Sequence, residues 1–375
     1  MSQTTDPNSQ NYNPMDDFGE SFEREQKKYK RPNILICGYT GSGKSSLIKA
    51  ILGDIVPDDA IGTGAPRTVG FDCYENKLVR IYDSRGYELG KTEEQFTQET
   101  RNFIRKCQSD LTNVDEHIHL VWYAIQGGGG RFTDFDKNLI FNIFNPQDVI
   151  VVITKTDTMT TRPGENVDRK AALKKVIMDA GIPEKRIVFT TDMYGGAIGC
   201  KELMNLSYEM LPEAYKDAFM DAQKVDKEAK IQAVKNKSGK ATGIVSAAVA
   251  SAGGVGAIPI PGSDAPILIS IQMGMIAGLA ALYGLREEAV KAAVYPMIAK
   301  VVGILAATSL SKLIPGLGSV IQATVAAALT AAMGAYVKNS FEQYAIDKIN
   351  GIASPSISFD SSIFMEYYKN AQKQK

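Results

Sequence analysis

Cysteine, histidine and net charge are all scarce in this chain of 375 residues. Its four cysteines lack the paired spacing of a zinc site or a disulfide framework, so we interpret them as reduced residues of a cytosolic protein. Lysine plus arginine and aspartate plus glutamate number 42 each, and this balance provides no overall field that would attract nucleic acid. The sequence also lacks a basic patch or an RNA-binding module, so we expect no nucleic-acid partner.

The first thirty residues contain no apolar segment of the kind found in a secretory signal. They begin with "MSQTTDPNSQNYNPMDD", and we expect residues 1–30 to form a polar, partly disordered segment. The charged stretch "DDFGESFEREQKKYKR" is expected to add a short helix before the first strand. Together with the unpaired cysteines, these features predict a cytoplasmic protein, which its carboxyl-terminal half could attach to or insert into a membrane.

Residues 31–212 alternate short β-branched runs with longer stretches of helical periodicity. This alternation predicts an α/β domain with a mostly parallel sheet and helices on both faces. The runs expected as strands include "NILICG", "KLVRIYD", "HIHLVWYAI", "DVIVVIT" and "RIVFTT".

The rest of the chain has a different composition. Residues 213–240 are highly charged and are expected to form one exposed linking helix. Residues 241–345 are rich in alanine, glycine and isoleucine and poor in charge, which predicts an all-α domain of helical hairpins. Residues 346–375 form a polar tail.

The stretch "LICGYTGSGKSSLIKAILG", from Leu35 to Gly53, fits the P-loop pattern G-x-x-x-x-G-K-[ST] between an expected strand and an expected helix. Its glycines let successive N–H groups point at an anion, and the helix adds its positive N-terminal end. Lys44 can reach the β- and γ-phosphates of a nucleotide, and the Ser45 hydroxyl can ligate Mg²⁺. The expected phosphate-binding residues are Gly38, Gly41, Ser42, Gly43, Lys44, Ser45 and Ser46.

A second short pattern, D-x-x-G, follows the next expected strand in "YDSRG". Asp83 can hold the magnesium ion through a water molecule, while the N–H of Gly86 can bind a γ-phosphate oxygen. Four residues alone are weak evidence, but their position at the end of a strand strengthens the interpretation.

The third pattern identifies the base. In "VIVVITKTD", Thr154, Lys155 and Asp157 match [NT]-K-x-D on a loop after a buried strand. Asp157 can accept hydrogen bonds from N1–H and the exocyclic amine of guanine, whereas adenine would leave the carboxylate unpaired. Lys155 can pack its stem along the base. The sequence therefore predicts GTP or GDP as the ligand, with Mg²⁺ as cofactor.

With these three motifs in this order, residues 30–212 resemble the Era-like branch of P-loop GTPases. The resemblance implies a switch threonine beyond the P-loop, for which Thr68 is the better candidate and Thr63 the weaker one. It also implies a last base-contacting loop, and Thr191 with Asp192 loosely matches it. Lys44, Thr68 and Gly86 are then the residues expected to act on the γ-phosphate. Ser45, Thr68 and Asp83 are the expected metal ligands.

The chain departs from related GTPases at two positions. Tyr87 stands where Ras-type enzymes have a water-orienting glutamine, and Gly41 stands where some relatives have an asparagine that holds potassium. The attacking water could be placed by backbone groups, by a partner subunit or by an arginine. For Arg85 and Arg131 a solvated surface position is favoured over a catalytic role. We expect slow intrinsic hydrolysis that a nucleotide-dependent homodimer or oligomer accelerates.

The carboxyl-terminal half leaves two alternatives open. Three uncharged stretches approach the length that spans a bilayer, at 243–263, 265–285 and 313–337, and spaced small residues allow close helix packing. Alanine-rich segments are only weakly driven into lipid, however, and apolar helices can be the core of a water-soluble bundle. We favour a bundle that can associate with membrane through 241–345 over a constitutive transmembrane anchor, and expect its turns at 259–263 and 315–319.

The stretch "IPIPGSDAPILISIQMGMIAGLAALYG" resembles the YcjF-like helical module that follows Era-like domains in many bacterial proteins. Its layout is also similar to the helical domain of immunity-related GTPases, through Pro261, Asp264, Tyr283 and Gly284. This resemblance carries no catalytic signature and implies membrane association only by analogy.

These observations favour a GTP-hydrolysing switch or mechanoenzyme whose helical half contacts membrane or partners. A nucleotide-binding scaffold with negligible hydrolysis is the alternative, because Tyr87 replaces the catalytic glutamine. An ATPase is a third possibility, against which Asp157 argues.

Overall fold

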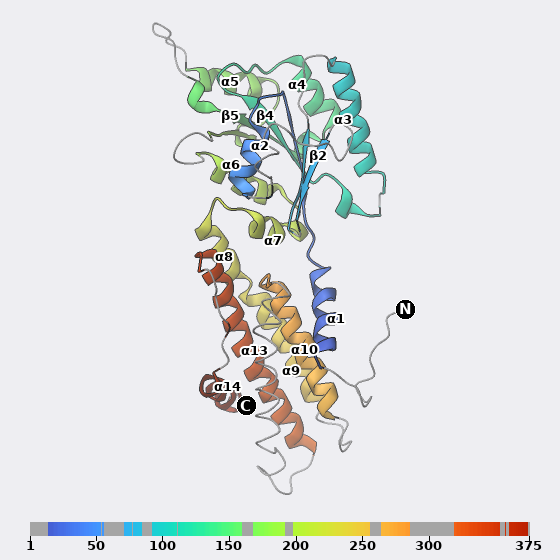
Figure 1. The fold of residues 1–375 in the computed structure, drawn as a ribbon, viewed down its shortest axis with the longest axis vertical. Helices are drawn as coiled ribbons and strands as arrows, with labels where there is room; N and C mark the ends of the chain where they lie inside the picture. The colour runs from blue at the N-terminus through green and yellow to red at the C-terminus, as the bar shows by residue number, and fades with distance from the viewer. Residues whose placement is uncertain are drawn as a thin grey trace. The chain divides into compact units, whose positions relative to one another are not determined.

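A six-stranded sheet forms the centre of the α/β part of the chain (Figure 1). The computed structural model describes residues 14–53, 55, 71–76, 78–84, 92–110, 112–159, 168–191, 198–255, 264–285, 319–352, 357 and 360–373. The chain divides into two units: Tyr29–Asp226 forms the α/β unit, and Met1–Lys28 together with Lys227–Lys375 forms the helical unit.

The strand order in the sheet is β2-β3-β1-β4-β5-β6. The strands are β1 (Asn33–Gly38), β2 (Phe71–Glu75), β3 (Arg80–Ser84), β4 (Leu120–Gln126), β5 (Val149–Thr154) and β6 (Ile187–Phe189). All neighbouring pairs are parallel except β2 with β3. This confirms the mostly parallel α/β sheet expected from the sequence, and β2 is an antiparallel edge strand beyond the expected runs.

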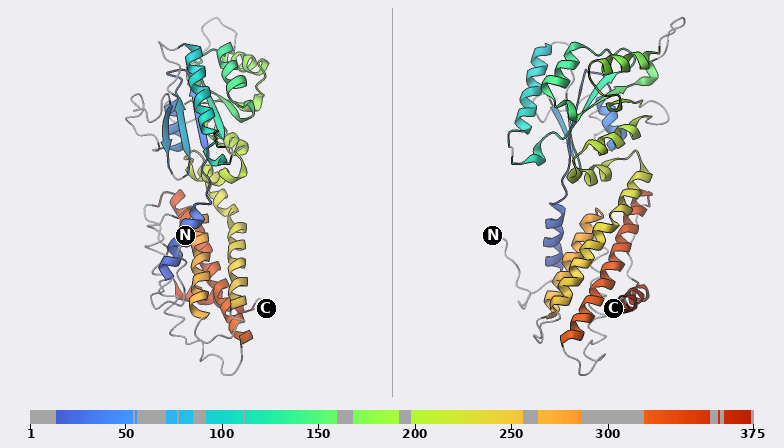
Figure 2. Two further views of the ribbon diagram at one scale, coloured as in Figure 1. Left: turned by 90° about the vertical axis from the view of Figure 1, so that its right-hand side faces the viewer. Right: turned by 180° about the vertical axis from the view of Figure 1, so that it is seen from behind.

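Helices cover both faces of this sheet (Figure 2). The helices of the unit are α2 (Lys44–Leu52), α3 (Glu93–Cys107), α4 (Asp134–Asn138, continued by a π-helical turn Leu139–Ile143), α5 (Arg169–Asp179), α6 (Cys200–Met210) and α7 (Glu213–Ala222). Side chains of α3, α4 and α5 pack with Leu35 and Tyr123 on one face. On the other face, the buried Trp122 donates a hydrogen bond to Ser207 Oγ of α6 at 2.9 Å. The alternating side chains of the central strands therefore supply two cores.

The helical unit contains six described helices and includes the beginning of the chain. They are α1 (Pro14–Gln26), α8 (Lys227–Asn236), α9 (Ser238–Val255), α10 (Asp264–Leu282), α13 (Ser319–Ile349) and α14 (Ser361–Lys373). The short charged helix expected near the amino terminus is α1, and its Phe18 and Phe22 are buried in the core of this unit. The single linking helix expected over 213–240 is instead divided among α7, α8 and the start of α9.

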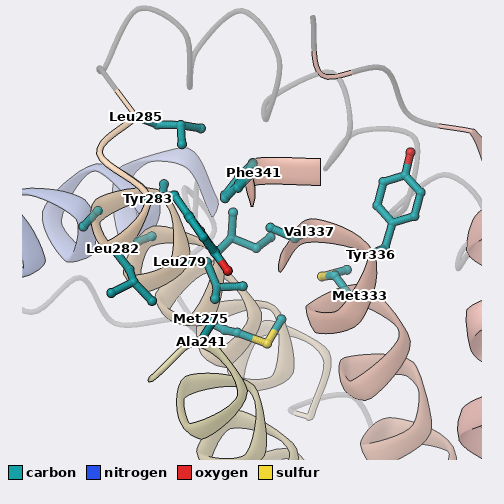
Figure 3. Close-up of a cluster of buried hydrophobic side chains, with 14 of the residues drawn as sticks. Ala241, Met275, Leu279, Leu282, Tyr283, Leu285, Met333, Tyr336, Val337 and Phe341 are labelled. Atoms are coloured by element: carbon teal, nitrogen blue, oxygen red, sulfur yellow. The ribbon is translucent and has the colours of Figure 1, made fainter. Parts of the chain in front are cut away.

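The core of the helical unit lies where α10 and α13 meet (Figure 3). Tyr283, which directly follows α10, lies near Val337 and Phe341 of α13, and its hydroxyl donates a hydrogen bond to Glu342 at 3.2 Å. Gln272 is also buried and donates to Thr330 Oγ1 at 3.2 Å, so its amide has a polar partner inside the apolar contact.

The described part of the chain contains no helix that is both long enough and apolar enough to span a membrane. The expected turns at 259–263 and 315–318, and with them Pro261, lie outside the described residues, and Ser319 begins α13. Gly284 lies two residues after α10 and has a left-handed conformation with φ of 68°.

We predict that Gly334→Ala destabilises the helical unit by about 1–3 kcal/mol through overpacking. A Cβ atom at Gly334 of α13 would lie 2.5 Å from Cγ1 of Val245 on α9 and 3.0 Å from Sδ of Met275 on α10. Neither the branched valine nor the helix backbone can move away without cost. Urea unfolding followed by circular dichroism measures the change.

Gly243→Ala on α9 is the matched control, because a Cβ atom there would contact nothing within 4 Å. Alanine in a helix interior is about 0.5–1 kcal/mol more stable than glycine, so the control should raise the unfolding midpoint. If Gly334→Ala also raised the midpoint, the close approach of α13 to α9 would be refuted.

Candidate nucleotide-binding site

A glycine-rich loop connects β1 to α2. Gly41 and Gly43 have φ of 77° and 81°, and Gly38, with φ of 148°, has no room for a side chain because a Cβ atom would overlap the carbonyl oxygen of Ala124. The loop turns at Tyr39, whose carbonyl accepts from the Ser42 N–H at 3.1 Å. The N-terminal end of α2 therefore directly follows a glycine-rich loop, and this arrangement can bind an anion through backbone N–H groups.

The side chain of Lys44 is folded against this loop. Its Nζ donates hydrogen bonds to the carbonyl oxygens of Gly38 at 3.2 Å and Tyr39 at 3.1 Å, and the residue is only 7% exposed. A mostly buried cation beside the P-loop backbone offers strong charge-assisted hydrogen bonds to a phosphate.

Ser45 and Asp83 form the second polar pair of the site. Ser45 Oγ donates to Asp83 Oδ2 at 2.8 Å, while Asp83 Oδ1 is buried without a hydrogen-bond partner. Burial raises the pKa of Asp83 to about 6, against the opposing effects of Lys44 and Ser45. A hydroxyl and a carboxylate with a vacant buried oxygen are the hard oxygen ligands that Mg²⁺ prefers, so these residues fit the expected ion.

The T-K-x-D loop is tied to the P-loop by two hydrogen bonds. Thr154 Oγ1 donates to the Ser42 carbonyl at 2.5 Å, and Lys155 Nζ donates to the Gly41 carbonyl at 2.8 Å. Lys155 has φ of 51° and is the one non-glycine residue with positive φ in the described part of the chain. This left-handed residue turns the chain sharply after β5.

Asp157 is exposed on that loop, and Thr191 fixes its orientation. Thr191 Oγ1 donates to Asp157 Oδ1 at 2.8 Å, and the Thr156 N–H donates to the Thr190 carbonyl at 3.2 Å. The loosest of the motif matches, Thr191, thus lies beside the carboxylate expected to bind the base.

The remaining residues expected at the site either make no contact that identifies a role or lie outside the described residues. Ser46 lies half-buried in the first turn of α2, and Arg131 is exposed. The residues expected in the switch segments lie outside the described residues; they are Thr63, Thr68, Arg85, Gly86 and Tyr87. Asp192, expected in the last base-contacting loop, also lies outside them.

A glycine turn outside the motifs begins beside this site. Gly127 follows β4, and its N–H donates to the Thr154 carbonyl at 2.8 Å, beside the T-K-x-D loop. The signal in the sequence is the run of four glycines in "IQGGGGRF", which directly precedes Arg131.

Comparison with known proteins shows what this part of the chain is similar to. Residues 33–155 match the family described as 50S ribosome-binding GTPase. Septin CDC11 from Candida albicans is 25% identical over 172 residues, which is 37% of this chain, and the chain spans 41% of the length of that septin.

Two solved structures are also similar to this chain. The G domain of the T. maritima FeoB iron transporter is 18% identical, with a TM-score of 0.30 over 48% of this chain and 98% of its own. Toc33 from Arabidopsis thaliana, solved with Mg²⁺ and GMPPNP, is 16% identical, with a TM-score of 0.33 over 56% of this chain and 94% of its own.

The P-loop lies between β1 and α2 of a mostly parallel sheet, and the family match covers the chain from that strand to the base-side loop. The α/β unit accordingly has the P-loop GTPase fold.

Proposed function

We propose that this chain binds GTP with Mg²⁺, hydrolyses it to GDP and works as an Era-like switch or mechanoenzyme. The observation that carries the proposal is the pair of hydrogen bonds from Thr154 and Lys155 to the P-loop. They join a phosphate end and a base end into one site of the kind a guanine nucleotide needs.

At the phosphate end, Lys44 would exchange its carbonyl partners for β- and γ-phosphate oxygens, and the P-loop N–H groups would surround the same anion. Ser45 and Asp83 would hold the magnesium ion, directly or through water. When bound, that ion neutralises the charge that develops on the phosphates. Thr68 and Gly86 are proposed to complete this end and to order the switch segments while the γ-phosphate is present.

At the base end, Asp157 would accept hydrogen bonds from guanine N1–H and the exocyclic amine. The Thr191 hydroxyl, which donates to the same carboxylate, keeps it oriented before the nucleotide arrives. Preorganisation of this kind lowers the cost of binding. Lys155, held on the Gly41 carbonyl, would lay its stem along the base.

The helical unit is proposed as the arm that contacts a partner or a membrane surface. From Thr242 to Gly254, α9 supports this with an outward face of small, uncharged residues; the exposed ones are Thr242, Gly243, Ser246, Ala247, Ala250, Ser251 and Gly254. Tyr87 replaces the glutamine that orients the attacking water in Ras-type enzymes. Self-association of the α/β unit is proposed to position this water instead, and so to accelerate hydrolysis.

Phosphate release from GTP, measured over a series of protein concentrations with and without anionic liposomes, tests this proposal. We expect magnesium-dependent GDP formation whose rate per molecule rises with protein concentration. Tight GTP binding without any turnover would instead favour the nucleotide-binding scaffold. An unchanged rate with liposomes, together with a protein that stays in the supernatant, would remove the membrane contact.

A further inference from the structure

The glycine turn after β4 packs directly against the T-K-x-D loop. A Cβ atom at Gly127 would lie 2.8 Å from Cγ of Met159 and 2.9 Å from the Thr154 carbonyl oxygen. At Gly129, in contrast, a Cβ atom would contact nothing within 4 Å. The turn therefore contains positions that require glycine and one that does not.

Gly128 has the closest relation to the base-side loop. A Cβ atom there would overlap Thr158 Oγ1 and lie 2.7 Å from Thr158 Cβ and 3.2 Å from its carbonyl oxygen. Gly128 is not among the glycines with positive φ, so a left-handed backbone is not what requires glycine there. Space for Thr158 is thus the reason that a side chain is excluded.

Thr158 in turn holds the turn that carries Asp157. Its Oγ1 donates to the Lys155 carbonyl at 2.6 Å, and its N–H donates to the same oxygen at 3.0 Å. Lys155 is the left-handed residue of the loop, a conformation that persists only where neighbours fix it. A displaced Thr158 would therefore move the Lys155 carbonyl. It would also move the carboxylate of Asp157, which lies between these two residues in the sequence.

We propose that Gly128 is a specificity-determining positioning residue for the nucleotide base. By leaving room for Thr158, it keeps the 155–158 turn where Asp157 can meet both donors of guanine. This inference rests on the proposed guanine-nucleotide function, and it assigns part of base selectivity to a residue outside every motif of the site.

Calorimetric titration of the full chain with GDP and with inosine diphosphate tests the proposal. Inosine lacks the exocyclic amine, so the ratio of the two affinities reports how well Asp157 is placed. We expect Gly128→Ala to weaken GDP binding at least about tenfold. We also expect it to reduce the ratio of the affinity for GDP to the affinity for inosine diphosphate. Gly129→Ala, the matched control, should leave both affinities within about twofold of the wild type.

Thr158→Val provides a second variant that adds no bulk beside Gly128. It keeps the shape of the side chain but removes the hydroxyl that donates to Lys155, so it should also narrow the ratio, even if Gly128→Ala fails to fold. In a Thr158→Gly background, Gly128→Ala should have little further effect, because its clash partner is gone.

Three results would overturn the inference. The first is a ratio of GDP affinity to inosine diphosphate affinity that stays at the wild-type value in both Gly128→Ala and Thr158→Val. The second is an equal loss of both nucleotides, which a merely structural role would produce. The third is that Gly128→Ala weakens GDP binding by the same factor in the Thr158→Gly background as in the wild-type chain. If the wild-type chain itself showed no preference for GDP over ADP, the proposed function would fail first, in a titration that contains no variant.

Discussion

Replacing Lys44 by alanine is expected to abolish GTP turnover and to weaken nucleotide binding by about 10²–10⁴-fold. The buried ammonium group now donates to the Gly38 and Tyr39 carbonyls and is expected to donate to two phosphates in the complex. A hydrogen bond to a charged group contributes about 1.5–3 kcal/mol, and two such bonds correspond to this range of affinity. Calorimetry for binding and phosphate release for turnover measure the two effects.

Lys170→Ala is the matched control for this loss of positive charge. Lys170 is exposed at the start of α5, and its backbone N–H is bonded by the Asp168 side chain, so the helix cap survives the substitution. The control should bind and hydrolyse GTP like the wild-type chain. Full GTP hydrolysis by Lys44→Ala would show that the P-loop is not the phosphate site.

Asp157→Asn is expected to reduce the preference for GTP over ATP by about 100-fold. A neutral amide cannot accept from both N1–H and the exocyclic amine of guanine, because one of its two polar ends is a donor. The substitution preserves the size of the side chain, and its oxygen can still accept from Thr191, which donates to Asp157 at 2.8 Å. The loss should therefore fall on base selectivity rather than on folding.

The same variant should bind xanthosine triphosphate better than the wild-type chain does. Xanthine has a carbonyl oxygen where guanine has its amine, and the new amide can donate to that oxygen. Asp179→Asn, at the exposed end of α5, removes the same charge elsewhere and should change neither preference. An unaltered GTP-to-ATP ratio in Asp157→Asn would exclude this carboxylate from base recognition.

The sequence predicts the centre of the α/β unit well because local patterns encode it. The buried runs at β1, β3, β4, β5 and β6 are short and β-branched, and the P-loop stands between a strand and a helix. Thr191 illustrates a weaker case, since its match to the motif is loose and only the folded chain brings its hydroxyl to Asp157.

Other features depend on contacts between distant parts of the chain. The strand β2, Phe71–Glu75, lies outside the runs that the sequence predicts as strands. Its strand character comes from pairing with β3, and propensity alone does not reveal an edge strand of this length. Gly128 is similar, because its need for glycine arises from Thr158, thirty residues away in the sequence.

The sequence predicts that the helical unit consists of helices, but it does not predict which helices make up the unit. Alanine-rich periodicity indicates helices, but it does not reveal that α1, from the other end of the chain, contributes Phe18 and Phe22 to the same core. The charged stretch at 213–240 reads as continuous helix, yet α7 ends at Ala222. Gln223 follows it in extended conformation and is fully buried, with its side chain bonded to the backbone of Val225 and Asp226.

The most direct test of the account is calorimetric titration of the wild-type chain with GTP and with ATP in the presence of Mg²⁺. The account predicts a single class of sites that binds GTP at least about 100-fold more tightly than ATP, because the Asp157 carboxylate finds two donors on guanine and none on the matching edge of adenine. Absence of heat with GTP, or equal affinity for both nucleotides, would contradict it.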